Sequence, residues 1–190
     1  MKPLSQPLHL PALITLIIAC GGCGIIGPNE PKADVSTPST YSKKGLEFQY
    51  PSNWKPGEEL DMLGVQQSGA ESPGSAIVMV QKFPAFVADD IRTYAKDYSE
   101  GMKENVSVGR ISDSKQGPLQ KQGDYESIRL SFSITLLDET VPHECVIYRK
   151  MEDGHVLFIM TQAATEDLHT AQPGFDLVLK TAKIRTPPPD

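Results

Sequence analysis

The chain has 190 residues, of which 39% are hydrophobic and 22% charged, as expected for one folded domain of ordinary size with segments outside it. Its formal charge of -6 argues against nonspecific nucleic-acid binding and against electrostatic attachment to anionic lipids, because both depend on clustered Lys and Arg. The three cysteines, Cys20, Cys23 and Cys145, are too few to build a disulfide framework, so we expect no structural disulfide.

The first residues are typical of an export signal. A positive start and a short apolar stretch, 8–19, precede a break at the small residue Ala19. The stretch is shorter than the roughly 20 apolar residues that a membrane-spanning helix needs. Its end, Ile17-Ile18-Ala19-Cys20, resembles the lipobox of bacterial lipoprotein precursors. This resemblance implies cleavage of a signal peptide over 1–19 and lipid attachment to the thiol of Cys20.

Lipid on Cys20 predicts an exported, membrane-anchored protein. One acyl chain holds a protein only marginally, whereas two or three make a stable anchor. Gly21 follows the cysteine, in place of the Asp that favours inner-membrane retention in lipoproteins of two-membrane bacteria. We therefore expect the outer membrane if the host has one. The alternatives are a Cys20–Cys23 redox pair, lipid on Cys23, and an uncleaved membrane anchor.

The next segment is rich in Gly, Pro, Ser and Thr and has no periodicity, which predicts a lipidated N-terminus and flexible linker over 20–40. About 20 such residues have an average span near 25 Å. The end of the sequence, 186–190, is a proline-rich polar tail that cannot continue a helix or a strand. The folded domain is therefore predicted over 41–185.

The domain is predicted to mix strands and helices. Apolar alternation and short apolar runs predict strands over 46–50, 60–67, 76–83, 106–111, 128–136, 141–151 and 155–163. Apolar stripes at helical spacing predict helices over 87–104 and from about 173 to 182, with Pro173 in the first turn of the second helix. A Gly- and Ser-rich loop is predicted over 68–75.

The hairpin around Asp153-Gly154 determines the predicted architecture. Its alignment places Tyr148 beside Ile159 on one face and Ile147 beside Met160 on the other. Since both faces carry large apolar groups, both need cover. We predict the α+β class, as an α/β/α sandwich whose largely antiparallel sheet of five to seven strands is covered by helices.

Two parts of the sequence resemble the PsbP-like and DcrB-like families. The run Phe48-Gln49-Tyr50-Pro51-Ser52-Asn53-Trp54 is similar to their F-x-x-P-x-x-W opening, here as F-x-Y-P-x-x-W. The ending is similar in its Asp153-Gly154 hairpin and in a last helix that contains Phe175 and Leu179. The likeness covers most of 41–184, apart from 57–75 and 109–124.

This resemblance implies a PsbP-like α/β/α sandwich, and many bacterial members are lipoproteins. Members are typically non-catalytic, and the photosynthetic ones are accessory proteins of photosystem II. No functional motif of the family matches, so no binding residue is carried over to this chain.

A few residues are candidates for chemistry. His143 and Cys145 share one face of a predicted strand, and Glu144 lies on the other. We expect a buried Cys145 and an ordinary His143, with a zinc site or a Cys-His catalytic pair as the alternatives; zinc would need two further ligands. The glycines of 69–76 have P-loop spacing but lack the lysine and the hydroxyl that bind nucleotide and magnesium, so a plain loop is expected.

For the other candidate binding residues, a structural role is the stronger interpretation. Trp54, Tyr94 and Tyr98 are predicted to pack in the core, with ligand stacking as the alternative. The acidic groups Glu58-Glu59-Asp61 and Glu166-Asp167 are expected to be solvated, with a weak calcium site as the alternative.

The sequence as a whole predicts a membrane-tethered, non-catalytic envelope lipoprotein whose domain binds or supports another protein. We predict no catalytic residue, cofactor or metal ligand, and the sequence does not identify the protein partner. A periplasmic small-ligand or metal-binding domain, motivated by His143, Cys145 and the acidic loops, is the second hypothesis. An enzyme with an unrecognised site is the third.

Overall fold

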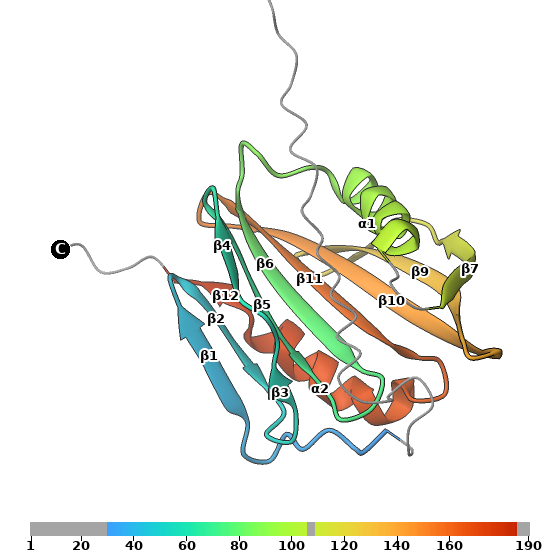
Figure 1. Ribbon diagram of the computed structural model, residues 1–190. Coiled ribbons are helices and arrows are strands. Elements are labelled where there is room, and N and C mark those ends of the chain that lie inside the picture. The colour runs from blue at the N-terminus through green and yellow to red at the C-terminus, as the bar shows by residue number, and fades with distance from the viewer. Residues whose placement is uncertain (1–29, 106–108, 186–190) are drawn as a thin grey trace, which may run out of the picture.

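The computed structural model of the protein describes residues 30–105 and 109–185 (Figure 1). The predicted signal peptide, Cys20 with its lipid, Cys23, the first part of the predicted linker and the tail 186–190 lie outside the described residues. Within the described part, no helix is long and apolar enough to cross a bilayer.

The described residues form one large sheet, one small sheet and two helices. The large sheet contains β3 (Lys55–Pro56), β4 (Leu60–Met62), β5 (Val65–Glu71), β6 (Ile77–Pro84), β7 (Arg110–Gln116), β8 (Gln120–Gln122), β9 (Tyr125–Leu136), β10 (Glu139–Glu152) and β11 (His155–Ala164). The small sheet contains β1 (Ser39–Lys43), β2 (Leu46–Tyr50) and β12 (Lys183–Ile184). The helices are α1 (Ile91–Asn105) and α2 (Leu168–Thr181).

The large sheet has the order β3-β5-β6-β11-β10-β9-β7, with β4 also paired to β5 and β8 to β9, and every pairing is antiparallel. In the β10–β11 hairpin Ile147 pairs with Met160 and Tyr148 with Ile159, as predicted. This register directs large apolar side chains to both faces of the sheet, and each face has its own core.

One face is covered by α1, whose buried side chains pack against β9, β10 and β11; this core includes Ile91, Tyr94, Tyr98, Met102, Ile128, Leu130, Ile147, Phe158 and Met160. The other face is covered by α2 together with β2; this core includes Leu46, Phe48, Val78, Val80, Leu157, Ile159, Phe175 and Val178. Figure 1 shows the two helices on opposite sides of the large sheet. The predicted α+β class with helices on both faces is confirmed.

Two details of the prediction are wrong. The described strands number nine in one sheet and three in the other, not five to seven in one sheet. The extra strands include β3 and β8, which have two or three residues and are too short for a periodic pattern to show. The single strand predicted over 60–67 is instead a hairpin, in which β4 pairs with β5 around a turn at Leu63-Gly64. The cover of the second face is also not made by helices alone, because Leu46 and Phe48 of β2 are buried there beside α2.

The loop predicted over 68–75 is shorter, because β5 continues to Glu71. The second helix begins at Leu168, so Pro173 lies inside it and not in its first turn. Pro173 has no N–H to donate to the carbonyl of His169, four residues earlier, and His169 is exposed to solvent. The helix was therefore predicted correctly near Pro173, but its first residue was predicted about five positions too late.

The flexible linker predicted over 20–40 is wrong from Glu30 onward. Glu30 and Ala33 are buried, with 4% and 3% of their surface exposed. The Ala33 N–H donates to the carbonyl oxygen of Thr170 at 3.2 Å, and the Ser52 N–H donates to that of Asp34 at 3.0 Å. The folded domain therefore includes the segment from Glu30 onward. An extended segment held by hydrogen bonds to distant loops has no periodicity, so sequence analysis missed it.

The loop between β5 and β6 closes around the Glu30 carboxylate. Its Oε2 accepts hydrogen bonds from Ser72 Oγ at 2.8 Å, from the Ser75 N–H at 2.6 Å and from the Ala76 N–H at 3.2 Å. These contacts attach the start of the described chain to one end of β6.

Candidate functional site

The residues considered for metal or catalytic chemistry lie in the core beneath α1. Cys145 is a fully buried free thiol, and burial raises its pKa, so the reactive thiolate is disfavoured. His143 is 4% exposed, stacks on Phe132 with ring centroids 5.8 Å apart, and has its Nδ1 3.1 Å from the carbonyl oxygen of Val141. Burial lowers the pKa of His143. The expectation of a buried Cys145 is confirmed.

Glu144 lies on the opposite face of β10, as predicted, and accepts a hydrogen bond from Arg129 Nη1 at 2.6 Å. Among residues 30–105 and 109–185, no three or more His, Cys, Asp and Glu side chains are grouped so that they could hold a metal ion. Among these residues, His143 and Cys145 are therefore not part of a group large enough for a metal site.

Tyr94 and Tyr98 pack in the core, as predicted, but their hydroxyls also form buried hydrogen bonds that sequence analysis missed. Tyr94 Oη donates to Gln81 Oε1, and Tyr98 Oη donates to Gln162 Oε1 at 3.0 Å. The Tyr94 ring stacks on Phe158 with centroids 4.1 Å apart. Burial raises the pKa of both tyrosines. These contacts fix α1 on the sheet and leave no ring face free for a ligand.

Trp54 is buried and meets the ring of Phe175 edge-on at 5.7 Å, so the packing interpretation is confirmed.

The acidic residues Glu59 and Asp61 form exposed ion pairs with Lys43 and Lys44. Asp167 accepts a hydrogen bond from Ser75 Oγ at 2.6 Å. These acidic groups have protein partners.

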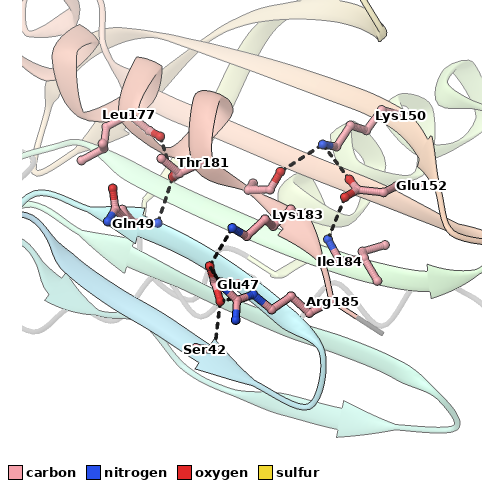
Figure 2. Close-up of polar contacts among 11 residues, drawn as sticks. Ser42, Glu47, Gln49, Lys150, Glu152, Leu177, Thr181, Lys183, Ile184 and Arg185 are labelled. Carbon is pink, nitrogen blue, oxygen red and sulfur yellow. Dashed lines mark hydrogen bonds and ion pairs between the residues drawn. The ribbon is translucent and has the colours of Figure 1, made fainter. Parts of the chain in front are cut away.

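A cluster of charges joins the small sheet to the large one (Figure 2). Glu47 lies between Lys183 Nζ at 2.9 Å and Arg185 Nε at 2.7 Å, and the hydrogen bond from Lys183 holds the pKa of Glu47 below its usual range. Beside it, Lys150 Nζ lies 2.7 Å from Glu152 and donates to the carbonyl oxygen of Ala182 at 3.0 Å.

Glu152 also accepts from the Ile184 N–H at 3.1 Å (Figure 2). This charged cluster therefore holds β12 against the β10–β11 hairpin. Its acidic and basic groups are matched within the fold, which gives it a structural role.

The clearest candidate for a functional surface is apolar. Among the described residues, seven large hydrophobic side chains are exposed, and five of them lie in or beside turns at one end of the large sheet. We call these five residues the apolar rim: Met62, Leu63, Phe86, Val87 and Met151. Phe86 is 90% exposed, Leu63 73% and Met151 56%. Clustered exposure of this kind marks interaction sites.

Strand order brings the apolar rim together. Met62 ends β4 and Leu63 lies in the β4–β5 turn, Phe86 and Val87 follow β6, and Met151 lies near the tip of the β10–β11 hairpin. β5, β6 and β11 are consecutive in the sheet, and neighbouring strands lie about 4.8 Å apart. The Ala85 N–H donates to the carbonyl oxygen of Gly154 at 3.2 Å, which joins two of the turns. Figure 1 shows the three turns at the same end of the sheet.

Sequence analysis missed the apolar rim. The first and last residues of the rim are 89 positions apart in the sequence, and no sequence motif connects them. The available signal was local: bulky apolar residues stand in or beside tight turns, where polar residues and glycine are usual.

The chain matches no protein-family model, and no curated protein matches its sequence. Its fold is similar to solved structures of low sequence identity. The cyanobacterial PsbP protein (CyanoP) of Synechocystis sp. PCC 6803 is 15% identical with a TM-score of 0.46, and the match covers 87% of this chain and 99% of that one.

A protein of Bacteroides thetaiotaomicron is 14% identical with a TM-score of 0.43; 83% of this chain is covered and 49% of that chain, so the match spans about half of it. LpqN of Mycobacterium tuberculosis, described as involved in cell envelope biogenesis, is 12% identical with a TM-score of 0.37, over 84% of this chain and 100% of that one. The first of the three belongs to the family that the sequence resembles. Likenesses of this degree carry no conclusion about function.

Proposed function

We propose that this chain is a membrane-tethered, non-catalytic accessory protein of the bacterial envelope, and that its domain binds another protein through the apolar rim. The rim is the observation that carries the proposal, because Met and aromatic side chains are enriched at protein interfaces. In this proposal lipid on Cys20 provides the tether, and the outer membrane is the location where the host has one.

The positions of the other candidate residues support a binding role over an enzymatic one. His143 and Cys145 are in the core, and the charged cluster around Glu47 and Glu152 is matched within the fold. The apolar rim is built on turns of a rigid sheet, which is a common way to present a binding surface.

The test compares two matched leucines. Leu63 and Leu137 are both exposed turn residues with positive φ, of 53° and 49°, but Leu137 lies in the β9–β10 turn, at the other end of the sheet. Asn tolerates this left-handed conformation, so Leu63→Asn and Leu137→Asn should both fold normally. Each is expressed as full-length protein in a two-membrane bacterium and crosslinked in intact cells, beside the wild type and Cys20→Ser.

We expect the wild type and Leu137→Asn to fractionate with membranes and to form one shared adduct with another protein. Leu63→Asn combined with Phe86→Ser should remain folded and in the membrane but lose this adduct. Cys20→Ser should move to the soluble fraction. An unlipidated Cys20 in the mass spectrum of the native protein would refute the tether, and an adduct that survives the double substitution would refute the role of the rim.

A further inference from the structure

We infer that the thioether of Met151 is a site of reversible oxidation by hydroperoxides, and that the guanidinium of Arg149 promotes this modification and holds its product. The oxidation does not depend on the proposed function. Its consequence, an apolar rim that becomes polar at Met151, rests on the proposed function and adds a form of regulation to it.

Exposure distinguishes Met151 from the other described methionines. Met151 is 56% exposed, Met62 is 38% exposed and Met79 is half-buried. Met102 and Met160 lie in the core beneath α1, with 1% and 2% of their surface exposed. An oxidant in solution must reach the sulfur, so the core methionines are protected for as long as the domain stays folded.

Arg149 places a fixed cation beside the sulfur of Met151. The two residues are two positions apart on β10, so their side chains leave the same face of the sheet. Arg149 Nη2 lies 3.9 Å from Met151 Sδ, while Nη1 donates to Glu126 Oε2 at 3.2 Å. The pair with Glu126 therefore holds the guanidinium with Nη2 beside the sulfur.

The guanidinium is better matched to the oxidised side chain than to the reduced one. Thioether sulfur is a weak hydrogen-bond acceptor, so it is a poor partner for Arg149 Nη2. Arg149 Nε is buried and has no hydrogen-bond partner among the described residues. A sulfoxide oxygen on Met151 would give this guanidinium a strong acceptor, in a hydrogen bond assisted by charge.

The reaction is a two-electron transfer of oxygen. The sulfur lone pair attacks one oxygen of hydrogen peroxide, the S–O bond forms and the O–O bond breaks. Sulfur is oxidised and the peroxide is reduced; the leaving hydroxide takes the proton of the transferred oxygen and becomes water. Negative charge develops on both oxygens, and the Arg149 guanidinium beside the sulfur stabilises it.

Oxidation changes the chemistry of the rim. It converts a flexible apolar side chain into a polar one, at one of the five residues that form the rim. In the proposed function, oxidised protein therefore binds its partner less tightly. Methionine sulfoxide reductases reverse the change, with a dithiol oxidised to a disulfide and water released. The exported location proposed for the chain is an oxidising one.

The first test measures oxidation on the purified full-length protein. Hydrogen peroxide is added to the wild type, Arg149→Gln and Arg129→Gln, and peptide mass spectrometry follows every methionine with time. Arg129→Gln is the matched control, because Arg129 pairs with Glu144 on the opposite face of the sheet. The two core methionines report in each sample whether the variant is folded.

We expect Met151 to be oxidised before Met62, and the core methionines to stay reduced. Arg149→Gln should lower the ratio of the Met151 rate to the Met62 rate by about twofold to fivefold, the effect of one exposed charge interaction. Arg129→Gln should leave the ratio unchanged. An unchanged ratio in Arg149→Gln, or oxidation of Met62 ahead of Met151 in the wild type, would overturn the inference.

The second test addresses regulation through the crosslinked adduct in intact cells. Met151→Gln introduces a polar side chain of similar length, and Met151→Leu keeps an apolar one. We expect Met151→Gln to lower the yield of adduct several-fold and Met151→Leu to retain it; equal yields would overturn the regulation. No adduct in the wild type would refute the proposed function and the regulation with it, whereas the oxidation of Met151 is decided by the first test alone.

Discussion

The carboxylate of Glu30 occupies the space that a side chain at position 74 would need. A Cβ on Gly74 would overlap Glu30 Oε2 and crowd its Cα, so the loop can close around the carboxylate only with glycine there. The glycine spacing that resembled a P-loop in the sequence thus serves a contact within the fold. The β5–β6 loop binds Glu30, in the segment that precedes β1, and carries no phosphate-binding lysine.

Replacement of Glu30 should destabilise the domain. Glu30→Ala removes the acceptor of three hydrogen bonds, including two backbone N–H groups of the β5–β6 loop. The Ala76 N–H keeps Ser72 Oγ as an acceptor at 3.0 Å, whereas the Ser75 N–H loses its printed acceptor. Leaving such a donor unpaired costs about 1 to 3 kcal/mol in the free energy of unfolding. Urea unfolding of Glu30→Ala and of the control Glu58→Ala, at an exposed position, measures this difference. Equal midpoints for the two variants would contradict the role of Glu30.

The boundary of the domain gives a second prediction. A chain of residues 30–185 should fold, whereas a chain of residues 41–185 should lose the buried Glu30 and Ala33 and the first two residues of β1. We expect a loss of about 3 kcal/mol or more in the free energy of unfolding, because buried groups and hydrogen bonds are removed together. Thermal unfolding of both chains, followed by circular dichroism, tests this. Equal stability would restore the start near residue 41.

Cys145 should be chemically inert in the folded protein. Its burial raises the thiol pKa, which lowers the fraction of reactive thiolate, and α1 blocks access. In the chain of residues 30–185, where it is the one remaining cysteine, alkylation by iodoacetamide at pH 8 should proceed only as fast as the domain opens. The same reaction in 6 M guanidinium, which should be complete within minutes, is the positive control. Rapid modification without denaturant would indicate an accessible and functional thiol.

The buried His143 should make stability fall in acid. Burial lowers its pKa below that of the unfolded chain, so the unfolded state binds the proton more tightly. The contribution of neutral His143 is complete above the unfolded pKa of about 6.5 and decreases as the pH falls from there toward the folded pKa.

Since acidic groups titrate in the same range, the measurement is a difference between variants. His143→Gln should lose less stability than the wild type between pH 8 and pH 5, and the exposed control His169→Gln should behave as the wild type does. Parallel stability curves for His143→Gln and the wild type would mean that His143 is not shielded from solvent.

The sequence by itself determined the layers of the fold. Alternate residues of a strand face opposite sides, so the pairing of Tyr148 with Ile159 and of Ile147 with Met160 followed from the Asp153-Gly154 turn alone. Two apolar faces then required cover on both. The same rule placed Cys145 in the core and Glu144 on the other side, because these assignments need only local periodicity.

Only the tertiary structure decided which distant segments become neighbours. The apolar rim exists because β5, β6 and β11 are adjacent in the sheet. Glu30 is buried because it meets a loop more than 40 residues away in sequence. Neither contact repeats along the chain. Periodicity reports which face a residue takes, whereas strand order and hydrogen bonds between remote residues depend on how the whole chain packs.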